Sequence, residues 1–251
     1  MMYKYCIFDL YGTLVDIHTD EEQLKLWEKL ALFYGYYGAR YTPLELKETY
    51  QRLTQQTSRE HISGGFHRNI GHEAFPELQI EDVFLKLFKE KNVEADMTLA
   101  VHGGQFFRVL STEYVRLYDG AAQMLSTLKE HGKTLILLSN AQRIFTEYEM
   151  KSLGIWDIFH HIFISSDYGI KKPDLNFYET MLARCHVVRD EAIMVGNDGI
   201  CDIRGAKAAG LATLYIRSNL SPEEDLPDAD HVVDTADMAK VGEILLKGGD
   251  K

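Results

Sequence analysis

The chain has few of the residues that mark disulfide-rich or membrane-spanning proteins. Its three cysteines are scattered along 251 residues and are too few for a disulfide framework or a zinc site. No apolar run approaches the ~18 residues that a membrane span needs. The amino terminus lacks a basic segment followed by an apolar core, so we expect no signal peptide. These absences predict a cytoplasmic protein.

Positive charge is also scarce. The chain has 27 lysines and arginines against 38 acidic residues, and its formal net charge is -11. This balance disfavours nucleic acid and anionic membranes as partners. A small anionic substrate stays compatible, because a few local cations and a metal ion can hold it. The length suits one large domain or a domain with a sizeable insertion, and nothing in the sequence indicates the oligomeric state.

Short apolar runs predict strands at the start of the chain and again beyond residue 115. Each later run is separated from the next by a helix-like segment, which is typical of right-handed βαβ units. We predict an α/β fold with a doubly wound, mostly parallel, Rossmann-like sheet built from residues 1–16 and 113–251. The predicted strands are Tyr3–Phe8, Thr134–Leu138, His161–Ile164, Ala192–Val195, Ala212–Ile216 and His231–Val233.

The segment between these two parts has a different character. Its apolar residues recur at helical spacing, and no stretch of it reads as a strand. Thr42 before Pro43, with Glu45 close behind, is a plausible helix start. We therefore predict an all-helical cap over residues 17–112. The predicted helices are Glu21–Tyr34, Pro43–Gln56, Ile80–Lys91 and Met97–Leu117.

The first candidate for chemistry is Asp9, which directly follows the first predicted strand. Gly12 lies three residues later and permits a tight turn. In an open parallel sheet, ligands bind at the carboxyl ends of the strands. A strand-end aspartate is often only a helix cap or a turn former, so Asp9 gains weight only from motifs further along the chain.

Three later motifs also follow predicted strands. The hydroxyl of Ser139 could cap the next helix or donate to an anionic oxygen at the helix start, and these roles are compatible. Pro173 stiffens the chain after Lys172, although a surface lysine is usually solvated. Asp198 and Asp202 could cap a helix or ligate a hard cation, since Mg²⁺ needs few protein carboxylates.

These four motifs, in this order, resemble those of the haloacid dehalogenase (HAD) superfamily. The resemblance covers the α/β part of the chain and implies the family's fold, with a helical cap inserted after the first strand. The matching runs are Phe8-Asp9-x-x-Gly12-Thr13, Leu137-Leu138-Ser139-Asn140-Ala141, Gly169-Ile170-Lys171-Lys172-Pro173-Asp174 and Gly196-Asn197-Asp198-Gly199-Ile200-Cys201-Asp202.

The resemblance also implies roles for individual residues. Asp9 would be the covalent nucleophile, and Ser139 would bind the transferred phosphoryl group. Lys172, immediately before the proline, would neutralise charge, and Lys171 would be its exposed neighbour. A small phosphorylated metabolite would be bound by Gly12, Thr13, Ser139, Asn140 and Lys172.

A magnesium site is implied by the same likeness. The family often has Gly-Asp where this chain has glycine followed by Asn197, so the register of the metal ligands stays open. Asp9, the carbonyl of Tyr11, and either Asp198 or Asn197 would bind Mg²⁺. Asp202 would bind it directly or through water.

Tyr11 departs from the common form of the family. Most HAD phosphatases have a second aspartate at this position, and general acid–base catalysis of that kind contributes ~10²–10⁴-fold to the rate. The phenol of Tyr11 could donate a hydrogen bond, but it is not a carboxylate. Tyrosine also occurs here in the 2-haloacid dehalogenases of the superfamily, where a halide leaves without a proton and no metal is needed.

Three functions fit these residues. Asp198 and Asp202 favour a Mg²⁺-dependent phosphatase that forms an aspartyl-phosphate, because without a cation they would only add like-charge repulsion beside Asp9. One alternative is a metal-independent 2-haloacid dehalogenase that uses Asp9 as nucleophile. The other is a HAD-like binding protein with little turnover, in which cap and core clasp a ligand or partner.

Overall fold

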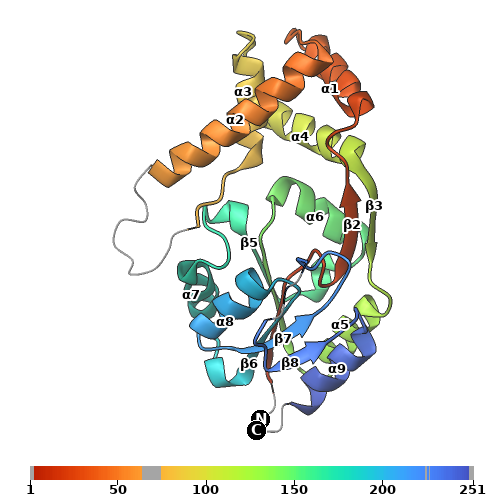
Figure 1. Cartoon of the computed structure of the whole chain (residues 1–251), viewed down its shortest axis with the longest axis vertical. Coiled ribbons are helices and arrows are strands. Elements are labelled where there is room, and N and C mark those ends of the chain that lie inside the picture. Colours follow the sequence, from red (N-terminus) through yellow and green to blue (C-terminus); the bar gives the residue numbers. More distant parts are fainter. Residues whose placement is uncertain (1–2, 64–74, 224, 226, 249–251) are drawn as a thin grey trace.

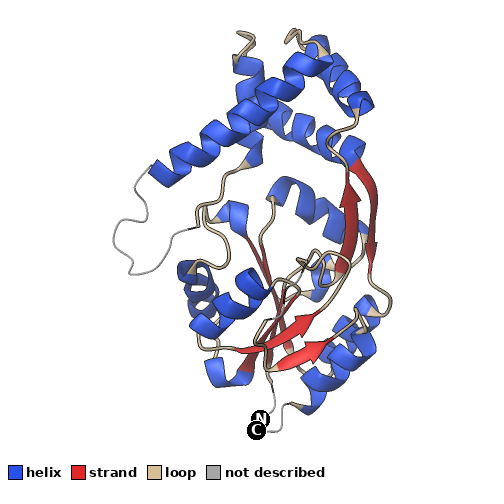
Figure 2. Ribbon diagram, in the orientation of Figure 1, coloured by secondary structure: helices blue, strands red, loops and turns tan. Residues whose placement is uncertain are grey.

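A six-stranded parallel sheet forms the centre of the molecule (Figures 1 and 2). The computed structural model describes residues 3–63, 75–223, 225 and 227–248. The strand order is β5-β4-β1-β6-β7-β8, so the chain winds away from β1 in both directions. The predicted doubly wound sheet is confirmed, with β1 starting two residues later than expected. The strands are β1 (Tyr5–Phe8), β4 (Thr134–Ser139), β5 (His161–Ile164), β6 (Ala192–Gly196), β7 (Ala212–Ile216) and β8 (His231–Val233).

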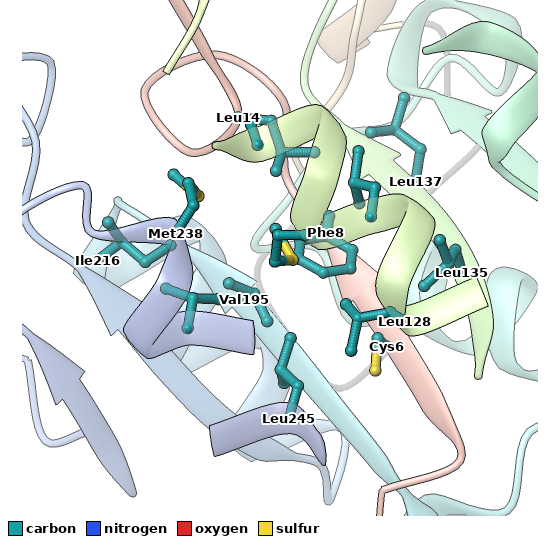
Figure 3. Packing of buried hydrophobic residues seen from close by; sticks show 14 of the residues in the cluster. Cys6, Phe8, Leu14, Leu128, Leu135, Leu137, Val195, Ile216, Met238 and Leu245 are labelled. Carbon is teal, nitrogen blue, oxygen red and sulfur yellow. The ribbon is translucent and has the colours of Figure 1, made fainter. Parts of the chain in front are cut away.

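Helices cover both faces of this sheet, which explains why its strands read as continuous apolar runs. On β1, Cys6 and Phe8 pack in one cluster with residues of α5 and α9 (Figure 3). Tyr5 and Ile7 point to the opposite face and pack with α7. The helices are α5 (Ala121–Glu130), α6 (Arg143–Ser152), α7 (Leu175–Arg184), α8 (Gly205–Ala208) and α9 (Met238–Lys247), with a π-helical turn at Gly199–Arg204 and 3₁₀ turns at Trp156–Ile158, Ser165–Asp167 and Arg189–Glu191.

Four further helices, which we call the cap, lie apart from the sheet in Figure 1. They bury a separate apolar cluster that includes Trp27, Phe84 and Phe107. The predicted helix start is a capping box: the Glu45 amide donates to Thr42 Oγ1 at 3.2 Å, and the Thr42 amide donates to Glu45 Oε2 at 3.4 Å. The cap helices are α1 (Leu24–Tyr36), α2 (Pro43–Ser63), α3 (Ile80–Lys89) and α4 (Met97–Ser111).

Two strands that the sequence did not reveal run between the core and the cap (Figure 2). The strands β2 (Val15–Thr19) and β3 (Thr112–Leu117) pair antiparallel. The prediction that this region is all-helical, with a helix reaching Leu117, was therefore wrong, and β2 crosses the predicted boundary at residue 16. The paired strands lie about a hundred residues apart, as between Asp16 and Arg116, so no local pattern marks the pairing.

No helix within the described residues combines the length and the apolar character that crossing a membrane requires.

Candidate active site

The strand order places Asp9 where the sheet reverses its winding. Phe8 ends β1 and pairs with Leu137 of β4 on one side and Val195 of β6 on the other. Asp9 follows directly, so its carboxylate lies between the carboxyl ends of β4 and β6. In an open α/β sheet this switch point is where ligands bind. The chain then turns back, with the amides of Leu14 and Val15 donating to the Leu10 carbonyl at 2.8 and 2.9 Å.

Gly12 is required by the shape of this turn. Its φ is +82°, and a Cβ atom there would lie 2.3 Å from Nδ2 of Asn197. We call residues 9–15 the Asp9 loop. Only glycine at position 12 lets this loop approach the end of β6 so closely. Thr13 is fully buried, and its hydroxyl lies 3.4 Å from Asp9 Oδ2 and 3.2 Å from Asn197 Oδ1.

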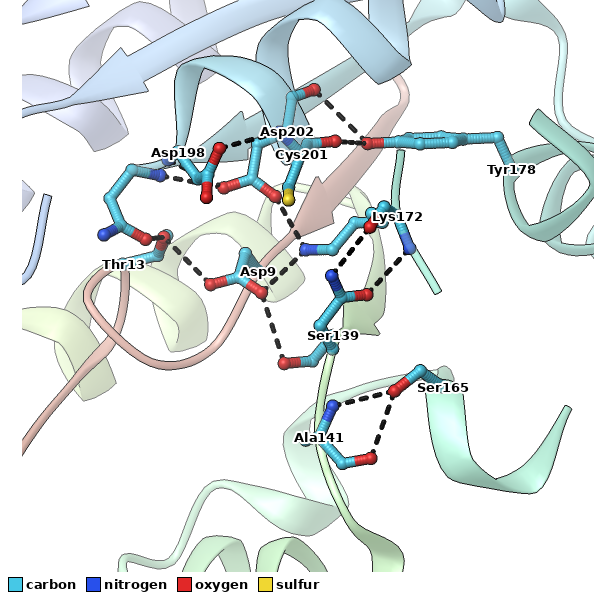
Figure 4. Close-up of polar contacts among 12 residues, drawn as sticks. Asp9, Thr13, Ser139, Ala141, Ser165, Lys172, Tyr178, Asp198, Cys201 and Asp202 are labelled. Carbon is cyan, nitrogen blue, oxygen red and sulfur yellow. Dashed lines mark hydrogen bonds and ion pairs between the residues drawn. The ribbon is translucent and has the colours of Figure 1, made fainter. Parts of the chain in front are cut away.

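Lys172 holds two carboxylates together beneath this loop (Figure 4). Its ammonium group donates to Asp9 Oδ1 at 2.7 Å and to Asp202 Oδ1 at 2.6 Å, and Ser139 Oγ donates to Asp9 Oδ1 at 3.2 Å. Burial alone would lower the pKa of Lys172, but the charges of Asp202 and Asp9 raise that pKa above its ordinary value. Lys172 is therefore a cation, and Asp9 Oδ1 is occupied by two donors.

The side chain of Asp202 organises the loop after β6. Its second oxygen accepts hydrogen bonds from the amides of Asn197 and Asp198, both at 3.0 Å. Burial, with a smaller contribution from Asp9, raises the pKa of Asp202 to about 7 against the opposing effect of Lys172. Both oxygens of Asp202 are thus held by donors at 3.0 Å or less, whereas the donor to Asp9 Oδ2 lies 3.4 Å away, so for Asp202 the geometry favours contact with a metal through water over direct ligation.

Asp198 caps the π-helical turn and still faces the cavity. Its Oδ1 accepts from the amides of Ile200 and Cys201 at 2.8 and 2.7 Å, which is the capping role that the sequence allowed. The capping uses one oxygen of the carboxylate. Capping and metal ligation are thus compatible for Asp198.

Asn140 has a different environment from the one expected for a substrate ligand. Its Oδ1 accepts from the amide of Lys172 at 2.8 Å, and its Nδ2 donates to the carbonyl of Lys172 at 2.9 Å. The side chain therefore positions the main chain of Lys172. The capping alternative for Ser139 was wrong, since α6 begins at Arg143 and is preceded by Gln142.

Tyr11 directs its hydroxyl towards α6. The phenol hydrogen-bonds to Glu149 Oε2 and lies 3.1 Å from Thr146 Oγ1, and Glu149 in turn accepts from Arg108 of α4. Burial, reinforced by the charge of Glu149, raises the pKa of Tyr11 well above its ordinary value. Sequence reasoning missed Glu149 and Arg108, because no motif marks either residue.

A cavity of about 200 Å³ opens at this edge of the sheet. Gly12 and Thr13 are not among its lining residues, although both shape the loop that borders it. Cys201, Leu220 and Pro222 line the cavity without having been predicted, and the last two follow β7 in a stretch with no motif. The predicted residues that line the cavity are Asp9, Tyr11, Ser139, Asn140, Lys172, Asn197, Asp198 and Asp202.

The lining residues fit a divalent cation. Within the described part of the chain, no three His, Cys, Asp or Glu side chains form a complete set of metal ligands. Mg²⁺ does not need one, because it keeps several waters and binds one or two carboxylates. Asp9, Asp198 and Asp202 line the cavity, and Lys172 pairs with Asp9 and Asp202, so three acidic side chains meet one ammonium group. The surplus negative charge is what a cation would neutralise.

Comparisons with known proteins identify the family. The model of the haloacid dehalogenase-like hydrolase family matches residues 3–210. The chain is 32% identical to the glyceraldehyde 3-phosphate phosphatase of Pyrococcus furiosus over 143 residues, and this alignment covers 55% of this chain and 59% of that enzyme. It is 30% identical over 125 residues to the phosphoserine phosphatase of Thermus thermophilus, 50% of this chain and 49% of that enzyme. The matches thus span about half the length of these curated relatives.

Solved structures resemble the whole chain. The 2-haloacid dehalogenase from Pseudomonas syringae pv. Tomato DC3000 has a TM-score of 0.62 at 22% identity, covering 98% of this chain and 99% of that one. The HAD-hydrolase YfnB of Bacillus subtilis bound to magnesium has a TM-score of 0.55 at 22% identity, with the same coverage. At these identities the likeness shows the fold.

Proposed function

The chain belongs to the haloacid dehalogenase-like hydrolase family, and from this premise we propose that it is a Mg²⁺-dependent phosphatase of a small phosphate ester. The observation that carries the proposal is the charge of the cavity, where Asp9, Asp198 and Asp202 outnumber the ammonium of Lys172. Such a site suits a metal ion and an anionic phosphoryl group together. The two phosphatase relatives support the same reaction class.

The residues suit nucleophilic catalysis in two steps. Ser139 and Lys172 donate to Asp9 Oδ1 and the Thr13 hydroxyl donates to Oδ2, which orients this carboxylate for attack on phosphorus. The new O–P bond gives an aspartyl-phosphate as the bond to the leaving oxygen breaks, and water then hydrolyses the intermediate. Lys172 and the Ser139 hydroxyl would contact the transferred group.

A bound Mg²⁺ would supply charge neutralisation for the phosphoryl oxygens. We assign its direct protein ligands to Asp9, the carbonyl of Tyr11, and Asp198. The Asn197 side-chain oxygen lies 3.2 Å from the Thr13 hydroxyl, and both oxygens of Asp202 accept hydrogen bonds of 3.0 Å or less, against 3.4 Å at Asp9 Oδ2. We therefore place Asn197 and Asp202 behind the direct ligands.

A second candidate is a 2-haloacid dehalogenase, and the observation that favours it is the direction of Tyr11. Its hydroxyl bonds to Glu149, so the position that carries a proton donor in most related phosphatases holds none here. A halide needs no proton. In that reaction Asp9 would attack carbon, the carbon–halogen bond would break with release of halide, and water would hydrolyse the resulting ester.

A screen of phosphate esters and 2-haloacids, each with Mg²⁺ and with a chelator, separates these functions. The phosphatase proposal expects phosphate release that a chelator stops and that Asp9→Asn abolishes. Halide release from 2-chloropropionate in the chelator would assign the chain to the dehalogenases instead. Turnover no higher than that of Asp9→Asn on every compound would favour the third reading, a binding protein.

A further inference from the structure

Side chains from three separate parts of the fold meet where the cap contacts the core. Tyr11 comes from the Asp9 loop, Glu149 from α6 of the core, and Arg108 from α4 of the cap. Arg108 Nε donates to Glu149 Oε1 at 2.6 Å and its Nη2 donates to Oε2 at 3.3 Å, while the Tyr11 hydroxyl bonds to the same Oε2. One carboxylate thus connects the loop that carries Asp9 to the cap.

The protons in this group can be assigned from its chemistry. A phenol has one proton, and the carboxylate of Glu149, charged beside Arg108, can only accept it. The Thr146 hydroxyl, 3.1 Å away, therefore donates to the Tyr11 oxygen. The hydroxyl proton of Tyr11 is therefore donated to Glu149 of α6 and is not directed at a leaving group.

Helix α4 approaches α6 closely at Gly104, beside an open groove of about 500 Å³ that Arg108 and Glu149 help to line. A Cβ atom on Gly104 of α4 would lie 2.7 Å from Cδ1 of Ile144 of α6, and Ile144 belongs to the apolar cluster of the cap. Gln105 Nε2 donates to the Ile144 carbonyl at 3.3 Å. Arg108 lies one helical turn after Gly104 and so points at the same partner helix.

The ion pair is largely withdrawn from water. The side chains of Arg108 and Glu149 are 19% and 12% exposed, and the guanidinium group lies 5.3 Å from the ring of Phe145. Charged groups in such a setting interact more strongly than on the surface and hold a defined geometry. The network is therefore suited to fixing the position of Tyr11, two residues from the nucleophile.

We propose that Glu149 and Arg108 are positioning residues. They hold the Tyr11 side chain, and thereby fix the position of the Asp9 loop relative to the cap. The proposal rests on Asp9 acting as nucleophile, but it applies equally to attack on phosphorus and attack on carbon. Tyr11 is then an anchor for the loop, and the enzyme works without a proton donor at this position.

Hydrogen exchange in the absence of substrate tests the anchor independently of the reaction. The reporters are the amides of Leu14 and Val15, which donate to Leu10 inside the loop. In Tyr11→Phe we expect these amides to exchange about tenfold faster, since the change removes a hydrogen bond to a charged group, and Glu149→Gln should raise exchange in the same direction because it replaces the charged acceptor by a neutral amide. The double variant should exchange no faster than Tyr11→Phe, because both changes act on the same link.

Glu147→Gln is the matched control. Glu147 lies on the same helix and pairs with Lys151 and Arg143 instead of the Asp9 loop. Its exchange at Leu14 and Val15 should equal that of the wild type. Unchanged exchange in Glu149→Gln, or additive effects in the double variant, would overturn the proposal. Arg108→Lys keeps the positive charge and tests the loss of the bidentate contact with Glu149.

Kinetics distinguish an anchor from a proton donor. Over phosphate esters of graded leaving-group pKa, loss of the anchor should lower kcat by a similar factor for every ester in Tyr11→Phe, Glu149→Gln and Arg108→Lys. A steeper dependence on leaving-group pKa in Tyr11→Phe alone would show that the phenol donates a proton, and the proposal would be wrong. If no ester is hydrolysed, the proposed function fails while the exchange experiment still decides the role of the network.

Discussion

At the scale of residues, Lys172 shows how one buried side chain joins three motifs. Its ammonium group lies between Asp9 and Asp202, and its main chain is held by both polar groups of the Asn140 side chain. A buried cation is tolerated only beside such partners. The same lysine keeps two neighbouring carboxylates from repelling each other, so the stability of the fold and the proposed chemistry depend on one group.

Replacing this lysine should cost stability as well as activity. In Lys172→Met, Asp9 and Asp202 lose their shared counterion in a buried site, and we expect the free energy of unfolding to fall by about 3–5 kcal/mol. Urea denaturation measures the change. Lys171→Met is the control, because Lys171 is 40% exposed and its closest carboxylate oxygen, on Glu77, is 4.0 Å away. Equal losses in the two variants would contradict the assignment of Lys172 as the buried partner.

At the scale of elements, Asp16 connects the two-stranded antiparallel sheet of β2 and β3, which we call the β2–β3 ribbon, to the edge of the cavity. This carboxylate is 5% exposed and accepts from Arg116 of β3 at 2.7 and 2.9 Å and from Asn219 at 2.9 Å. Asn219 precedes Leu220, which lines the cavity. The ribbon therefore connects the cap both to the sheet and to one wall of the site.

Removing Asp16 should loosen this wall. In Asp16→Ala, the side-chain amide of Asn219 and the guanidinium of Arg116 lose their acceptor, and we expect a loss of about 1–3 kcal/mol in unfolding free energy. The KM of a hydrolysed substrate should rise more than kcat falls, because Leu220 lines the cavity and is not among the residues assigned to the reaction. Glu113→Ala is the control on the same ribbon, with a half-exposed side chain. No difference between these variants in KM would refute the link.

The pairing of β4 with β5 should weaken in acid. His160 is an exposed residue whose Nδ1 accepts the Leu135 amide at 3.0 Å, and partial burial of its ring, helped by the charge of Lys129, lowers its pKa. A depressed pKa in the folded state means that the unfolded chain binds the proton first. The stabilisation is complete above the ordinary pKa of about 6.5 and is lost as the pH falls through the lower folded value. Melting temperatures from pH 7.5 to 4.5 should show this decline, and His160→Asn should reduce it; an identical decline in the variant would exclude His160.

Elements were predictable where the signal is local. Each strand of the sheet is a short apolar run, and each motif lies at or shortly after the end of one, so parallel packing brings Asp9, Ser139 and Asp198 around one cavity. The β2–β3 ribbon was not predicted, because its pairing joins residues far apart in the chain. The partners of Tyr11 were not predicted for the same reason, since Glu149 is 138 residues away and lies on a helix with ordinary amphipathic spacing.

At the scale of the whole molecule, the negative charges of the chain are screened strongly on the surface and weakly around the cavity. The formal net charge of -11 is solvated over most of the surface, where water and salt screen it. Around the cavity, the carboxylates of Asp9 and Asp202 are buried, and screening is weak there. A divalent cation should therefore bind the folded protein at this site far more tightly than it binds the unfolded chain.

Mg²⁺ should consequently raise the melting temperature. A ligand that binds only the folded state at 100 times its Kd adds about 2.7 kcal/mol, which corresponds to roughly 5–10 °C for a chain of this size. Asp198→Ala should abolish most of the shift, since it removes a carboxylate from the cavity. Glu243→Ala removes the same charge from an exposed position on α9, where Glu243 pairs with Lys247, and should leave the shift intact. Thermal unfolding at constant ionic strength separates a site from general screening: equal shifts in both variants would place Mg²⁺ on the surface, and no shift in the wild type would remove the metal from the proposed reaction.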